Sequence, residues 1–194
     1  MTTIFAFDAA TSRASCALVR GGELIAERAS DSRRLLSTAI ELTDQAAIGL
    51  GEIDALVVGT GPGSFTSIRI GLATARALCF ALGLPAAGVS TLRAFSGGRP
   101  VIDARRGQVF SESSAEGPTV GRPEELDVAG ARLVGDGALR YRALFEAAGA
   151  EVPPDADPAH RASAALLVAH AGAYGDAERI EAVYLRPPDA RPTR

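Results

Sequence analysis

The chain has 194 residues, 47% of them hydrophobic and 22% charged, with a formal net charge of −3 and a sequence pI of about 5.5. This length is enough for one domain or two small lobes with a buried core. The acidic balance excludes the basic footprint of a protein that binds nucleic acid by itself, so we expect any role with RNA to need a partner.

Three features of the sequence predict a cytoplasmic protein with no membrane segment. The longest uncharged run, residues 77–92, has 16 residues interrupted by glycine and proline, fewer than the ~20 that span a bilayer. No basic segment precedes Asp8, so no secretory signal is indicated. Cys16 and Cys79 fall in apolar patterns and are expected to be reduced and buried. The mean hydropathy of +0.13 favours an apolar surface covered by another protein.

The first half of the chain predicts the element order βββαβα. Three strands are expected in residues 3–8 and 14–28, with a hairpin at Gly21 and Gly22, and then a helix over residues 32–50 with Ser32 as its N-cap. A buried strand at residues 54–59 leads into a glycine-rich loop and a long helix. Residues 84–89 predict one more strand or crossover, and a lobe boundary is expected near Gly97.

The second half repeats this order in reduced form. "VIDARRGQVF" resembles "AFDAATSRASCALV", and "LVGDGAL" at residues 133–139 resembles "VVGTGPG". Helices over residues 138–148 and 161–174 and a last strand at residues 181–186 are expected to complete this lobe. We therefore expect an α/β protein with lobes at residues 1–97 and 98–194. A duplicated βββαβα unit with an aspartate at each first hairpin is similar to the actin-like (ASKHA, ribonuclease H-like) group.

Four motifs together resemble the TsaB (YeaZ) family, which is related to TsaD: "GTGPGSFTSIRIGLATARALCFALGLPAAGVSTL", "FDAATSRASCALV", "IDARRGQVF" and "YLRPPDAR". The resemblance implies a partner of TsaD, which transfers a threonylcarbamoyl group from threonylcarbamoyl-AMP to the adenosine next to the anticodon of tRNA. It also implies a small ATPase, TsaE, in the bacterial complex, contact with tRNA only through that complex, and a homodimer as an option for the isolated chain. Ser67 and Ala9 depart from the usual family pattern.

The loop "GTGPGSF" raises the question of phosphate binding, because loop amides before a helix favour an anion. All 20 basic residues are arginine, so the lysine of a P-loop is missing, and the spacing does not fit G-x-G-x-x-G. A weaker phosphate or nucleotide site is expected across the two hairpins, made by Asp8, Thr11, Ser12, Gly61, Gly63, Ser64 and Asp103. No cofactor is required by this interpretation, and ATP or ADP at the interface with TsaD is left open.

Each of these residues also has a structural interpretation. Asp8 and Asp103 can position magnesium or water across a cleft, or each can hydrogen-bond the turn after its strand. Ser64 fits a helix N-cap better than a catalytic nucleophile, because no G-x-S-x-G motif surrounds it. Arg105 and Arg106 at the second hairpin are either solvated or near phosphate.

No catalytic or metal-binding residue is predicted. Aligned with the histidine segment of TsaD, this chain has Thr91 and Phe95 at the positions of the two metal-binding histidines. His160 and His170 are ten residues apart, which does not place them together on one helix face.

The sequence favours a partner interface on the two helices of the first lobe. Small residues four apart on the second helix would allow close approach of another helix, or would pack inside the chain. The predicted interface comprises Leu35, Leu36, Ala39, Ile40, Ser67, Gly71 and Ala75. The preferred function is a non-catalytic partner of TsaD. The alternative is a free-standing actin-like enzyme, either a phosphotransferase or a glycoprotease-type peptidase.

Overall fold

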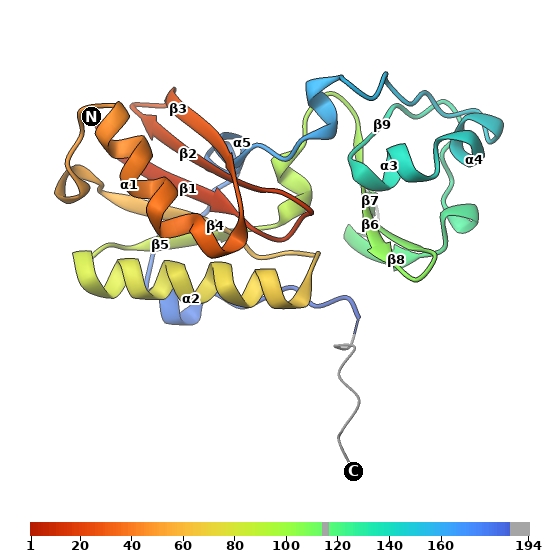
Figure 1. Cartoon of the computed structure of the whole chain (residues 1–194). Helices are drawn as coiled ribbons and strands as arrows, with labels where there is room; N and C mark the ends of the chain where they lie inside the picture. Colours follow the sequence, from red (N-terminus) through yellow and green to blue (C-terminus); the bar gives the residue numbers. More distant parts are fainter. Residues whose placement is uncertain (114–116, 187–194) are drawn as a thin grey trace, which may run out of the picture.

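The computed structural model describes residues 1–113 and 117–186, which form two lobes side by side (Figure 1). Each lobe contains one β-sheet. The strands of the first sheet are β1 (Thr3–Asp8), β2 (Ala14–Arg20), β3 (Glu23–Ser30), β4 (Ala55–Gly59) and β5 (Ala86–Val89). Those of the second are β6 (Arg99–Arg105), β7 (Gln108–Ser113), β8 (Gly117–Gly121) and β9 (Leu133–Val134).

The first sheet has the order β3-β2-β1-β4-β5, which follows from the βββαβα succession. β1, β2 and β3 form an antiparallel meander, and the two-residue Gly21-Gly22 turn has positive φ at both positions, as a tight hairpin requires. β4 lies parallel to β1, and β5 lies parallel to β4. The five predicted strands of this lobe are confirmed.

Helices cover both faces of the first sheet. On one face, α1 (Leu35–Gln45) and α2 (Phe65–Leu82) share a core cluster with β1, β2 and β4. On the opposite face, α5 (Ala164–Ala169) contacts β1, β2 and β4, with Leu167 at the centre of a second cluster. The first lobe is thus a three-layer α/β structure.

The second lobe is smaller. Its sheet has the order β8-β7-β6-β9, and β6 pairs antiparallel with β7 and parallel with β9. A 3-10 turn at Pro123–Glu125 takes the place of an α-helix between β8 and β9, so the element order βββαβα is shortened to βββ followed by β9 and two short helices. These are α3 (Asp136–Arg140) and α4 (Arg142–Ala147), where the sequence predicts one helix over residues 138–148.

The end of the described chain returns to the first lobe, which corrects the expected second lobe of residues 98–194. α5 packs on the first sheet, Gly175 forms a β-bridge with Ala86, and Val183 donates its N–H to the Thr60 carbonyl at 2.8 Å. Helix α5 has six residues instead of the predicted 161–174, and residues 181–186 do not form the predicted strand. The Val183 N–H bonds Thr60, a loop residue, instead of a strand of either sheet.

The start of α1 also differs from the prediction. A 3-10 turn at Ser32–Arg34 precedes the helix, and its N-cap is Asp31, whose carboxylate accepts the Arg33 N–H at 2.8 Å. The N-cap is therefore one residue earlier than the predicted Ser32. The helix ends at Gln45, before Ala47, whose φ of 52° lies in the left-handed region.

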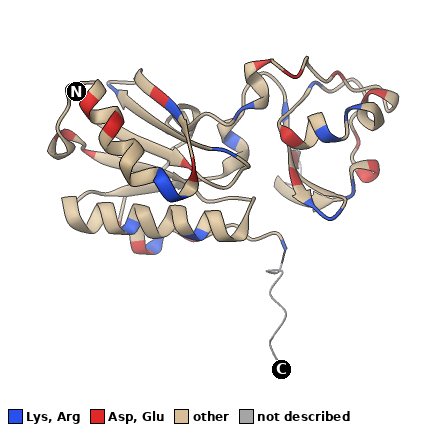
Figure 2. Ribbon diagram, in the orientation of Figure 1, with Lys and Arg blue, Asp and Glu red and all other residues tan. Residues whose placement is uncertain are grey.

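Within the described ranges, α2 is the helix long and apolar enough to cross a membrane, with 18 residues and a mean hydropathy of 1.3. Figure 2 shows little charge along it. Its inward residues, including Ile68 and Leu72, are buried in the first core, whereas most of its other residues are at least partly exposed.

Candidate functional site

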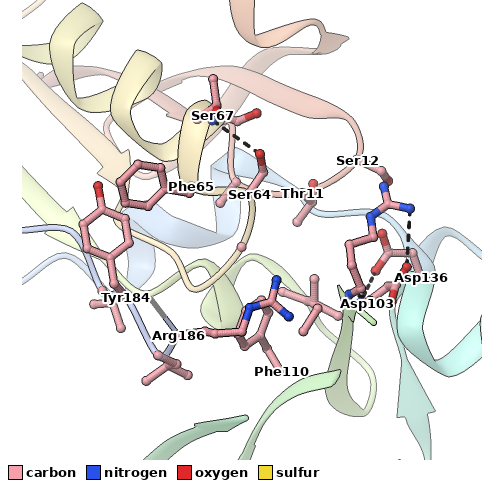
Figure 3. Close-up of a pocket in the computed structure, with 18 residues that line it drawn as sticks. Thr11, Ser12, Ser64, Phe65, Ser67, Asp103, Phe110, Asp136, Tyr184 and Arg186 are labelled. Carbon is pink, nitrogen blue, oxygen red and sulfur yellow. Dashed lines mark hydrogen bonds and ion pairs between the residues drawn. The ribbon is translucent and has the colours of Figure 1, made fainter. Parts of the chain in front are cut away.

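A cleft of about 640 Å³ lies between the lobes. It is bounded by the β1–β2 turn, the start of α2, the β6–β7 hairpin and residues 183–186 near the end of the described chain (Figure 3). Of the seven residues predicted to bind phosphate or nucleotide, five line it: Thr11, Ser12, Gly63, Ser64 and Asp103. Asp8 and Gly61 do not belong to its lining.

The glycine loop packs directly on the β1–β2 turn. The Ser64 N–H donates to the Ala10 carbonyl at 2.8 Å, and a Cβ on Gly63 would overlap that carbonyl oxygen. The Ser64 side chain accepts the Ser67 N–H at 3.4 Å, so Ser64 is the N-cap of α2, as the sequence predicts. Glycine at position 63 therefore allows the loop to approach the neighbouring turn closely.

A buried chain of hydrogen bonds connects this loop to β1 and to the end of β5. The Gly61 N–H donates to Oγ1 of Thr91 at 3.0 Å, and the Thr91 hydroxyl donates to Oδ2 of Asp8 at 2.5 Å. Thr91 and Asp8 are both fully buried, at 0% exposure. The amides of Gly61 and Ser64 therefore have internal partners, and the expected anion site at residues 61–65 stays a prediction.

Asp8 points into the core instead of the cleft. Its Oδ1 accepts the Ala10 N–H at 2.9 Å, and its Oδ2 occupies the space that a Cβ on Gly59 would need. Burial raises the pKa of the Asp8 carboxyl, although its hydrogen bonds from Thr91 and the backbone act in the opposite direction. The prediction of Asp8 as a cleft residue is therefore wrong, and its interpretation as a turn-bonding aspartate is confirmed.

Asp103 lies in the cleft and is held by its own lobe. Its Oδ1 accepts the Arg105 N–H at 2.9 Å, and its Oδ2 forms an ion pair with Arg140 at 3.0 Å. Its backbone N–H donates to the Asp136 carboxylate at 3.0 Å. Asp8 and Asp103 thus bond the turn in the same way, each accepting the N–H two residues later, while only Asp103 faces the cleft.

The opposite side of the cleft is aromatic, and its residues are not among those predicted from the sequence. The rings of Phe65 and Tyr184 stand 4.7 Å apart, far from Asp103 and Asp136 in Figure 3. The Arg69 guanidinium lies 5.4 Å from the centre of the Phe65 ring. Phe65 and Tyr184 are 119 positions apart in sequence, and no local pattern connects them.

The predicted partner interface is largely internal. Leu35, Ala39 and Ala75 are each 1% exposed, and Gly71 is buried with the position of its absent Cβ 3.5 Å from the Ala9 Cβ. The small residues let α2 approach the sheet and the β1–β2 turn closely, so their expected outward position is wrong. Ser67 is half-buried at the cleft.

The outer surfaces of α1 and α2 nevertheless carry large apolar side chains. Leu36 is 51% exposed and Ile40 is 42% exposed on α1, and Phe80 is 94% exposed on α2. The role of Leu36 and Ile40 in binding a partner stays a prediction. Phe80 was not among the predicted residues, although at about 100° per residue it lies about 120° from Ile68, outside the buried face of α2, which could have indicated exposure.

The histidines and cysteines occupy structural positions. Nδ1 of His160 accepts the Gly135 N–H at 3.2 Å, and its Nε2 lies 3.0 Å from the Pro153 carbonyl, while His170 is exposed. Both cysteines are buried, and burial raises the pKa of Cys16 to about 12. Among the described residues, no group of three or more His, Cys, Asp or Glu is placed to hold a metal ion.

Residues 24–130 match the family model described as TsaD, tRNA N6-adenosine threonylcarbamoyltransferase. An uncharacterized protein of Mycobacterium tuberculosis is 34% identical over 99% of this chain and 95% of its own length. The tRNA threonylcarbamoyladenosine biosynthesis protein TsaB of Escherichia coli is 35% identical over 55% of this chain and 52% of its own length. The match to this named relative therefore spans about half of each protein.

The three-dimensional comparison extends over nearly the whole chain. The structure of YeaZ from Pseudomonas aeruginosa superposes with a TM-score of 0.76 and 25% identity, covering 95% of this chain and 100% of that one. The predicted two-lobed α/β fold is confirmed by this likeness. Together, the family model, the TsaB sequences and the YeaZ fold show that the chain belongs to the TsaB (YeaZ) family.

Proposed function

We propose that this chain is a non-catalytic partner of a TsaD-type transferase in the synthesis of threonylcarbamoyladenosine in tRNA. The names of its TsaB relatives and the matching family model support this pathway. The structural observation that carries the non-catalytic role is the buried Asp8–Thr91–Gly61 chain. It removes an aspartate from the cleft and places an internal threonine at a position aligned with a metal-binding histidine of TsaD.

Docking is proposed on the outer faces of α1 and α2. Leu36, Ile40 and Phe80 are exposed there, whereas most large apolar side chains of the first lobe are buried. Burying such side chains against a partner contributes about 25 cal/mol for each Å² of apolar surface removed from water. TsaE would join the pair, tRNA would be contacted through the complex, and the isolated chain would use the same face to form a homodimer. Such a complex would act in the cytoplasm.

The proposed role requires no cofactor in the cleft of this chain. The amides of Gly61 and Ser64 already have internal partners, so we place any ATP or ADP at the joint with the TsaD-type partner. Calorimetric titration of the isolated chain with either nucleotide is expected to give no binding heat. Saturable binding to the isolated chain would contradict this part of the proposal.

A reconstituted transfer assay tests the function. TsaD, TsaE, threonylcarbamoyl-AMP and tRNA are combined with and without this chain, and modified adenosine is measured by mass spectrometry. Modification is expected only when the chain is present. Modification that does not depend on the chain would overturn the proposal, and hydrolysis of ATP or peptide by the chain alone would favour a free-standing enzyme.

The docking face is tested with two charges placed on its α1 part. The double variant Leu36→Asp/Ile40→Asp is expected to weaken association with the partner at least about 100-fold, because two buried charges without partners oppose complex formation. Ala143→Asp, on the exposed surface of α4, is the matched control and is expected to bind normally. Unchanged calorimetric affinity in the double variant, with its circular dichroism also unchanged, would place docking elsewhere.

A further inference from the structure

The last described segment, residues 176–186, is here called the strap, and its first half is fixed to the first lobe. The Arg76 guanidinium donates to the carbonyls of Ala177 and Glu178 at 3.5 Å and of Ile180 at 3.1 Å. Arg76 also forms an ion pair with the Glu178 carboxylate at 3.5 Å. One side chain of α2 therefore holds three successive parts of the strap.

The middle of the strap follows the loop at the end of β4. The Val183 N–H donates to the Thr60 carbonyl at 2.8 Å. The Ile180 side chain fills the space beside Gly88, where a Cβ would come within 2.6 Å of Cγ2 of Ile180. The absence of a side chain at position 88 thus allows the strap to lie against the end of the sheet.

The far end of the strap reaches the second lobe. Leu185 packs against an apolar cluster that contains Leu92 from the first lobe and Ile102 and Phe110 from the second. The Arg186 guanidinium donates to Oε1 of Gln108, on β7, at 3.3 Å. The strap therefore contacts both lobes, although the chain has already left the second lobe before α5.

Between these two anchors the strap forms one side of the cleft. Residues 183–186 belong to the cleft lining, and the Tyr184 ring lies against Phe65 at the first turn of α2 (Figure 3). Within residues 1–113 and 117–186, the chain passes from one lobe to the other at the segments before β6 and before α5. Two crossings of this kind act as a hinge, so a third connection fixes how far the lobes open.

We propose that the strap is a latch that sets the opening of the interlobe cleft. Release of Tyr184 from Phe65 and of Leu185 from the apolar cluster lets the second lobe rotate and widens the cleft. Two other ties join the lobes. One is the apolar cluster itself, which contains Leu92 of the first lobe with Ile102 and Phe110 of the second. The other is the ion pair of Arg93 with Glu112 at 2.6 Å, which salt screens because Arg93 is half-exposed. The latch does not depend on the proposed partner.

The distance between the lobes measures the latch directly. Spin labels are attached at Asp44→Cys on α1 and Ala143→Cys on α4, both exposed positions, and double electron–electron resonance is recorded at high salt. The strap variant Tyr184→Ala/Leu185→Ala is expected to shift the distance distribution to longer values and broaden it. Glu181→Ala, an exposed strap residue, is the matched control and is expected to reproduce the parent distribution.

The native cysteines are buried and are replaced by serine or alanine in the parent used for labelling. If the double strap variant fails to fold, Tyr184→Ala alone is measured, since this ring is 45% exposed and its loss leaves the apolar cluster in place. Amide exchange in the β6–β7 hairpin is expected to accelerate about tenfold in the folded strap variant, as local opening becomes easier. A distance distribution identical to the parent in the folded strap variant would overturn the latch.

Discussion

The substitution Thr91→Val removes the centre of the buried hydrogen-bond chain and keeps the shape of the side chain. The Gly61 N–H loses the acceptor now 3.0 Å away, and Oδ2 of Asp8 loses the hydroxyl now 2.5 Å away. Each buried polar group left without a partner costs about 1–3 kcal/mol, so we expect the free energy of unfolding to fall by about 2–6 kcal/mol. This is a large part of the roughly 5–15 kcal/mol that typically stabilises a protein.

Urea unfolding at neutral pH, followed by far-ultraviolet circular dichroism, measures this loss. Thr91→Ser is the matched control, because it keeps the hydroxyl and removes one methyl group, a change of about 1 kcal/mol. The valine variant should therefore unfold at a clearly lower urea concentration than the serine variant, with the same dependence on urea. If the two variants unfold at the same concentration, the hydroxyl does not stabilise the fold and the argument is refuted.

Two further predictions concern the same region. Burial raises the pKa of Asp8 above its ordinary value of 3.8, so the folded chain retains this proton at pH values where the unfolded chain has released it, and stability falls as the pH rises through the raised pKa. Asp8→Asn should flatten this part of the stability profile measured by urea unfolding, and a slope that persists in the variant would contradict the assignment. Gly63→Ala should lower the melting temperature by more than about 4 °C, because the added Cβ overlaps the Ala10 carbonyl. Gly172→Ala is the control and should leave the melting temperature unchanged, because its added Cβ has no atom within 4 Å. Equal melting curves for the two variants would contradict this prediction.

The first lobe was predictable because its information is local. Short apolar runs bounded by Gly21-Gly22 or by the glycine loop specify strands, and the βββαβα succession then limits how those strands can be ordered in the sheet. The Ser64 cap was equally local, since its partner is the N–H of Ser67. The return of the chain to the first lobe could not be predicted, because α5 is short and apolar and its sequence does not indicate which sheet it covers.

It was harder to predict whether the small residues of α2 face the core or the solvent. Gly71 and Ala75 fit either a surface for a partner helix or close packing on the sheet. Ile68 and Leu72 lie on the same helix face and are large and apolar, so this face indicates packing on the sheet. Asp8 illustrates a second limit. Whether it enters the cleft depends on Gly59, whose missing side chain makes room for the carboxylate, and on Thr91, which is 83 positions away.

The return of α5 to the first sheet makes the second lobe an insertion within a discontinuous domain. The chain leaves and re-enters the first lobe at neighbouring points, since the Ser163 N–H donates to the Ala94 carbonyl at 2.8 Å. Both layers of helices on the first sheet are built from residues outside the inserted segment. A short loop could therefore replace residues 98–160, because the two ends that it must join already lie close together. The inserted lobe is thus free to vary in size while the first lobe keeps its core.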